Sequence, residues 1–201
     1  QGVSSAASDV YKRQILDISL VRSMHACFFE PYPHEKQPAS ALPDRSWREF
    51  GSGLMRPPRR GPVPQKNPLL AYPRAMSEEA LRQASKLEPD PHEDIALEYQ
   101  NPLNGGPAFA NLGLMLQMLR PGVQGRPRRQ ATSKLYYVVR GEGATTIEGK
   151  RFEWETGDFV LVPPWQWHEH ANRSTSREAV LFQVNDIPAM SALGYYREES
   201  K

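Results

Sequence analysis

The chain has 201 residues and a formal net charge of +2 at pH 7, and 39% of its residues are hydrophobic. This near-balanced charge argues against a dedicated nucleic-acid binder, and the lack of a long apolar run argues against a membrane span. The single cysteine, Cys27, rules out an internal disulfide framework and suits a reducing compartment. We therefore expect a cytoplasmic protein whose partners are small molecules or proteins, with no nucleic-acid or membrane partner.

The first 34 residues differ in character from the rest. Residues 1–14 resemble translated adapter sequence, so we expect them to be a non-native leader. Residues 15–34 are apolar enough for a packed element but too short to form a core of their own. We expect them to be the tail of a truncated N-terminal domain, which makes the chain a piece of a longer protein.

Residues 35–94 read as a proline-rich linker. Prolines recur every few residues between Pro38 and Pro68, which forbids long helices and central strands. One short helix is expected over residues 77–87, with Ser77 as its N-cap and Pro89 beyond its end.

Short apolar or alternating runs separated by turn residues follow the linker, a pattern typical of all-β sandwiches and barrels. The expected strands cover residues 96–100, 112–119, 135–139, 144–147, 159–162, 166–171 and 179–184. Their spacing predicts a double-stranded β-helix, or jelly roll, over residues 95–190. A closing helix over 186–193 and a charged tail over 191–201 complete the chain.

Two spaced motifs in this region resemble those that carry the metal ligands of cupin barrels. The second motif keeps one ligand, His168, and has Trp165 in the usual glycine slot. The first motif has the right spacing, but its ligand positions hold Arg128, Gln130 and Lys134. Arginine has no lone pair to donate and lysine must first lose its proton, so these side chains exclude a divalent metal. We expect neither a metal nor a catalytic residue in this barrel.

The retained histidine has a neighbour at strand spacing. If His168 points into the barrel, His170 does too, and the pair could form a salvage metal site or simply form hydrogen bonds. Trp165 and Trp167 would then face outward, where they would cover a chain segment or another subunit.

The replaced ligands suggest a different kind of site. The four weak candidates for substrate binding are Arg128, Gln130, Lys134 and His168, which could converge as a cationic pocket for a carboxylate. The alternative is that the cations pair with carboxylates at the surface or rim, for which the candidates are Glu142, Glu148 and Asp158.

Several longer segments resemble the gentisate 1,2-dioxygenase family, which includes relatives acting on salicylate and 1-hydroxy-2-naphthoate. They are YQNPLNGGP at 99–107, YYVVRGEG at 136–143, WETGD at 154–158, PPWQWHEHAN at 163–172 and LGYYR at 193–197. FFEPYP at 28–33 resembles the exit from that family's N-terminal cupin. The resemblance runs from Ile15 to the end of the chain. It does not show which of these aromatic acids is the substrate.

The resemblance implies an Fe(II) enzyme that opens the ring of a hydroxylated aromatic acid with O2, with the iron on three histidines of the N-terminal cupin. Residues 15–34 would be the tail of that cupin, and residues 95–190 the metal-free C-terminal one. We expect this chain alone to be inactive and the longer protein to form a homo-oligomer. The alternatives are a non-catalytic cupin that binds a small carboxylate, or a structural barrel for oligomer assembly.

Overall fold

The computed structural model describes residues 15–35, 42–53, 55, 58 and 67–201, and the chain divides into two compact units, Gln1–Ala41 and Leu42–Lys201. The expected leader, residues 1–14, lies outside the described residues. In the first unit, helix α2 (Ile18–Ser23) has no buried residue, and Phe28 and Phe29 are exposed. The apolar side chains of this unit therefore form no core within the described residues.

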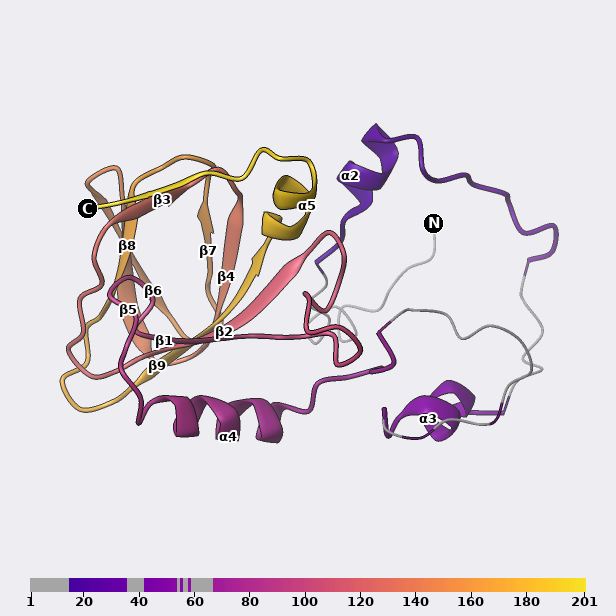
Figure 1. Ribbon diagram of the computed structural model, residues 1–201, viewed down its shortest axis with the longest axis horizontal. Helices are drawn as coiled ribbons and strands as arrows, with labels where there is room; N and C mark the ends of the chain where they lie inside the picture. Colours follow the sequence, from indigo (N-terminus) through magenta and orange to yellow (C-terminus); the bar gives the residue numbers. More distant parts are fainter. Residues whose placement is uncertain (1–14, 36–41, 54, 56–57, 59–66) are drawn as a thin grey trace. The chain divides into compact units, whose positions relative to one another are not determined.

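The second unit contains two five-stranded sheets in which all neighbouring strands are antiparallel (Figure 1). The first sheet has the order β1 (Ile95–Glu98), β2 (Gly113–Leu119), β9 (Ala179–Asn185), β4 (Lys134–Arg140) and β7 (Phe159–Val162). The second has the order β10 (Glu198–Ser200), β3 (Arg128–Gln130), β8 (His168–Asn172), β5 (Glu142–Ile147) and β6 (Lys150–Glu155). The predicted all-β cupin jelly roll is thus confirmed.

The burial of the strands explains why most of them could be predicted. β4 alternates between buried and half-buried residues, as expected for a strand with one face toward the core. β9 lies between β2 and β4 and is buried at every position except Phe182, which matches its continuous apolar run. The core between the sheets includes Tyr136, Val138, Trp154 and Leu181.

Three strands were missed because their sequences are charged. β3 reads RRQ and β10 reads EES, so neither carries the apolar pattern of a strand, and in β6, KRFEWE, the alternating Phe152 and Trp154 stand among four charged residues. Their strand conformation comes from pairing with neighbours, since β10 pairs with β3 and β6 pairs with β5. The segment expected to be only a charged tail therefore forms the edge of the second sheet.

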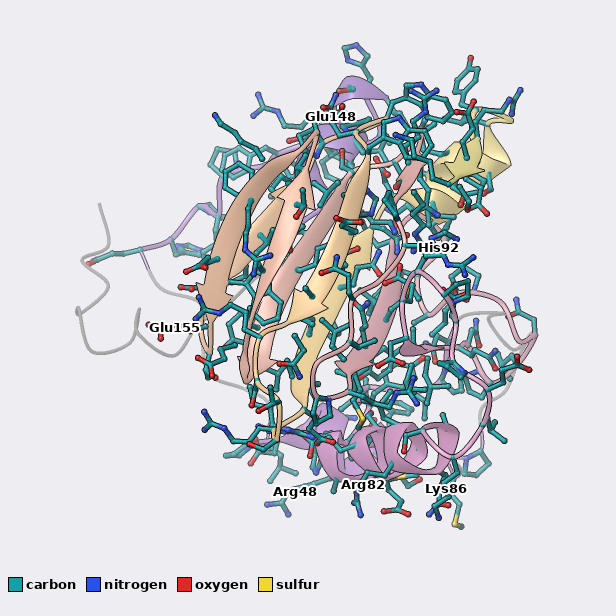
Figure 2. All side chains as sticks on the ribbon, turned by 90° about the vertical axis from the view of Figure 1, so that its left-hand side faces the viewer. Arg48, Arg82, Lys86, His92, Glu148 and Glu155 are labelled. Atoms are coloured by element: carbon teal, nitrogen blue, oxygen red, sulfur yellow. The ribbon has the colours of Figure 1, made fainter. Side chains whose placement is uncertain are left out.

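The linker helix is present but begins three residues earlier than predicted. α4 spans Arg74–Ala84, because Pro73 in the extended conformation starts it and the Ser77 hydroxyl donates to the Pro73 carbonyl from inside the first turn. Leu81 is fully buried against β1 and β2, whereas Arg82 and Lys86 point away from the strands (Figure 2). A second linker helix, α3 (Arg45–Phe50), was not predicted; it is only six residues long and lies between prolines.

The closing helix was predicted correctly. α5 spans Ile187–Ala192, with Asp186 as its N-cap and Pro188 in its first turn. None of the helices in the described parts of the chain is long and apolar enough to cross a membrane.

Candidate functional site

The positions that carry metal ligands in a cupin lie on three strands, of which β3 and β8 are neighbours in the second sheet and β4 belongs to the first. β3 carries Arg128 and Gln130, β4 begins at Lys134, and β8 begins at His168. Arg128 lies directly opposite His168 in the β3–β8 pairing. The first three side chains line one cleft, while His168 is not among the residues that line it. The structure therefore brings three of the four predicted site residues into one cleft and places His168 opposite Arg128, outside the cleft lining.

A single buried carboxylate pairs with both cations. Glu93, which is 4% exposed, accepts at Oε1 from the Lys134 ammonium at 3.3 Å, and Arg128 pairs with the same oxygen. Burial and the neighbouring Arg128 guanidinium hold the pKa of Lys134 well below its usual value. Lys134 is 1% exposed, and its contact with Glu93 lies in the interior of the barrel.

The carboxylates considered from the sequence are engaged elsewhere. Glu142 lies 3.5 Å from the guanidinium of Arg173 and also 3.5 Å from that of Arg177. Glu148 accepts from the backbone N–H of Trp167, and Asp158 accepts from that of Glu155. Arg128 and Lys134 thus pair with a carboxylate, as the alternative reading of the sequence had it, but the partner is Glu93. Glu93 precedes the first strand and lies outside both motifs, so no spacing rule pointed to it.

The C-terminal segment supplies the partners of Gln130. Its amide nitrogen donates to Tyr196 Oη at 2.7 Å and to Glu198 Oε2 at 2.8 Å, and the Tyr196 hydroxyl donates to the same carboxylate at 2.5 Å. Burial, followed by the hydrogen bond to Glu198, raises the pKa of Tyr196 to about 12. Tyr196 and Glu198 are thus site residues that sequence reasoning missed, because it treated this segment as a tail.

His168 and His170 both point inward, as the strand alternation predicts, and are 4% and 2% exposed. His168 Nδ1 is 3.0 Å from the Gln166 carbonyl, so it must carry the proton and leave Nε2 with the lone pair. His170 Nδ1 is 2.9 Å from the Thr145 hydroxyl, which also accepts from the Trp154 indole. Burial lowers the pKa of His168 to about 3 and that of His170 well below its usual value, so both are neutral.

These donors do not fit a metal ion. If the Thr145 hydroxyl donates to His170 Nδ1, then His170 Nε2 carries a proton and cannot coordinate. Arg128 and Lys134 stand where two further ligands would be needed. Within the described residues, no group of three or more histidine, cysteine, aspartate or glutamate side chains could hold a metal. The described residues therefore do not offer the third ligand that the salvage site considered from the sequence would need.

Trp165 and Trp167 are covered by a segment of their own chain. The Arg129 guanidinium lies 4.6 Å from the Trp165 ring and 4.8 Å from the Trp167 ring, and the Lys201 ammonium lies 4.1 Å from the latter. Trp165 has φ +63°, in the left-handed region that favours glycine. This explains why the motif usually has glycine at that position.

Comparison with known proteins agrees with this architecture. Residues 115–185 match the model of the cupin domain, which agrees with the two antiparallel sheets. Its sequence is 35% identical to the 5-aminosalicylate 1,2-dioxygenase of Comamonas sp, over 98% of this chain and 52% of that protein. It is also 31% identical to the 1-hydroxy-2-naphthoate 1,2-dioxygenase of Nocardioides sp. (strain KP7), over 98% of this chain and 50% of that protein.

A solved structure of a 1,2-dioxygenase is also similar to this chain. The crystal structure of salicylate 1,2-dioxygenase from Pseudoaminobacter salicylatoxidans with gentisate superposes with a TM-score of 0.74 at 26% identity, over 92% of this chain and 52% of that one. The resemblance to the gentisate 1,2-dioxygenase family is thereby confirmed. The chain spans about half the length of these relatives, and a C-terminal portion fits this match.

Proposed function

We propose that this chain is the C-terminal, metal-free cupin of a cytoplasmic, homo-oligomeric enzyme that opens the ring of a hydroxylated aromatic acid with O2. The relatives, which are 1,2-dioxygenases matched over nearly the whole chain, support the reaction class. The observation that carries the metal-free part is the pairing of Arg128 and Lys134 with Glu93 at metal-ligand positions. Fe(II) would then belong to the N-terminal cupin of the longer protein, and this barrel would support assembly.

The same ion pairs favour a structural role over a carboxylate-binding one. A carboxylate ligand would have to compete with Glu93, which already accepts from both cations at one oxygen. Removing one partner from a buried ion pair costs about 3–5 kcal/mol. Arg128, Lys134 and Glu93 can therefore be explained by a structural role alone, which is to hold β3 and β4 to the segment before β1.

The first test is iron binding by the 201-residue chain. It would be incubated anaerobically with Fe(II) and desalted, and bound iron and oxygen uptake with gentisate, salicylate and 1-hydroxy-2-naphthoate would be measured. We expect no retained iron and no oxygen uptake, because one imidazole lone pair beside two cations cannot hold the metal. The 5-aminosalicylate 1,2-dioxygenase of Comamonas sp, assayed with 5-aminosalicylate, is the positive control.

Stoichiometric iron with oxygen uptake would contradict the metal-free assignment and place a site around His168 and His170. The reaction class has its own test. The chain would be extended by the sequence encoded upstream and assayed in the same way. Oxygen uptake by the extended protein would support the dioxygenase assignment, and an upstream region without an HxH pair and a later histidine at cupin spacing would contradict it.

A further inference from the structure

The strand β6 forms one edge of the second sheet, and within the described residues no strand pairs with its outer side. Every residue of β6 except Trp154 is exposed. Figure 2 marks the two ends of the strand by Glu148, in the turn before it, and Glu155. An exposed edge strand offers unpaired backbone groups to a strand of another chain.

The turn before β6 shows which of its backbone groups point to the open edge. Glu148 and Gly149 both have positive φ, as in a two-residue type I′ turn, and Ile147 pairs with Lys150 across it. Because the residues that flank such a turn bond to each other, every second residue from Lys150 onward bonds to β5. The residues between them point their N–H and carbonyl groups outward.

These outward residues are Arg151, Glu153 and Glu155. The groups of Glu155 are occupied, since its N–H donates to the Asp158 carboxylate at 2.9 Å and its carbonyl accepts from the Asp158 N–H at 3.1 Å. In the part of the chain that the structure describes, the backbone groups of Arg151 and Glu153 that point outward have no such partner. These two residues are therefore open to pairing with another strand.

The charges of β6 fit a second copy of β6 in one register. In a two-fold antiparallel pair, the residue at the centre lies opposite its own copy, and like charges placed opposite each other are destabilising. Centring the pair on any charged residue of β6 therefore opposes like charges, and centring it on Trp154 sets Glu153 opposite Glu155. Centring it on Phe152 sets Arg151 opposite Glu153 of the second copy, and Glu153 opposite Arg151.

Both side chains have capacity for this contact. Within one chain, Arg151 Nε lies 3.9 Å from Glu153 Oε1, while the guanidinium of Arg173 lies 2.5 Å from Oε2. Glu153 Oε1 can therefore accept from Arg151 of the second copy while Arg173 keeps the other oxygen.

The same register brings two aromatic rings together. The two copies of Phe152 would form a pair without backbone hydrogen bonds, in which side chains approach most closely. Phe152 is 45% exposed and lines a hollow of about 250 Å³ together with Trp154, Val160 and Leu161. A second phenyl ring can therefore pack there and leave the water.

We propose that β6 pairs antiparallel with β6 of a second copy of this chain, centred on Phe152, and so joins the second sheets of two barrels. Charges on an edge strand usually keep other chains away. Here both signs are present, at positions that oppose each other in a single register, so they select this partner. The inference rests on the homo-oligomeric part of the proposed function and gives that assembly a surface.

Sedimentation equilibrium of the 201-residue chain at pH 7.5 and low salt should show a monomer–dimer equilibrium. Arg151→Glu and Glu153→Arg each set like charges opposite each other, and each should weaken the dimer by at least about tenfold. An equimolar mixture of the two variants should recover the dimer, because one variant supplies both acids and the other both bases. This recovery also shows that both variants are folded.

The matched control is the pair Lys150→Glu and Glu155→Lys, which makes the same charge changes on the same strand. In the proposed register these residues lie opposite Trp154 and Gly149, so no charge faces them. Each control variant should change the dissociation constant by less than about threefold, and mixing them should add nothing.

A dimer that Arg151→Glu and Glu153→Arg leave unchanged uses another surface, and a dimer that they abolish without recovery on mixing uses another register. Either result overturns the proposal. A chain that stays monomeric at all concentrations leaves the edge to another partner, such as the upstream domain, and overturns both the proposal and the role of this barrel in assembly. Iron binding and oxygen uptake are measured separately, so the reaction class and the metal-free assignment do not depend on these outcomes.

Discussion

Trp165 occupies a backbone conformation that suits glycine better than tryptophan. Its φ of +63° is left-handed, and a side chain there costs about 1–2 kcal/mol. The Arg129 guanidinium, which lies 4.6 Å from its ring, offsets part of that cost. The barrel thus keeps the turn geometry of its motif while using the side chain to hold β3.

Two substitutions separate these effects. Trp165→Gly removes both the ring and the strain, whereas Trp165→Ala removes the ring and keeps the strain. We expect the glycine variant to be more stable than the alanine variant by about 1 kcal/mol in urea unfolding. Equal stability of the two variants would show that the left-handed turn is not maintained without the tryptophan.

The neutral histidines make stability depend on pH. Burial lowers the pKa of His168 to about 3 and that of His170 well below its usual value, and Lys134 and Arg128 lower both further. An unfolded histidine titrates near 6.5, so below that pH the unfolded state takes up protons that the folded state does not. Stability is therefore fully present above about pH 6.5 and falls as the pH drops toward about 3.

The expected contribution of each histidine is about 1.4 kcal/mol between pH 7.5 and pH 5.5. When the pH falls from 7.5 to 5.5, the unfolding free energy of His170→Gln should drop by about 1.4 kcal/mol less than that of the unchanged chain. Urea unfolding at the two pH values measures it, and His34→Gln, at an exposed histidine, is the control. An unchanged loss in His170→Gln would mean that His170 is protonated in the folded barrel.

At the scale of elements, β10 closes the edge of the second sheet. It pairs with β3 through Glu199 and Arg129, whose side chains form an ion pair at 2.6 Å. It also carries Glu198 to Gln130 and is followed by Lys201 over Trp167. A three-residue strand without apolar residues is thus held by charged and aromatic contacts on both of its sides.

Deleting residues 198–201 should destabilise the barrel by about 1–3 kcal/mol, because it removes an ion pair, a cation–π contact and the hydrogen bond to Gln130. Urea unfolding would measure the loss, and tryptophan emission should change as Trp167 loses its cover. Lys201→Ala removes only the cation–π contact and should cost less than about 1 kcal/mol. A deletion no more costly than this control would show that β10 adds nothing to stability.

Sequence reasoning predicted those parts of the fold that leave a local pattern. The alternation in β4 and the apolar run of β9 identified the first sheet, and the glycine spacing identified the cupin. β3 and β10 could not be predicted, since their strand conformation depends on partners far away in the chain. The same holds for the site: Arg128 and Lys134 were identified by spacing, while Glu93 meets them only in the folded chain.

At the scale of the whole molecule, the strand order has a consequence for how the chain is made. β9 lies between β2 and β4, yet it follows β4 by about forty residues and β2 by about sixty. Until residues 179–185 leave the ribosome, the inner edges of β2 and β4 have no partner, and the first sheet cannot assemble. Assembly of the first sheet must therefore wait until β9 has been synthesised, and a chain stopped before β9 would expose two open strand edges to aggregation.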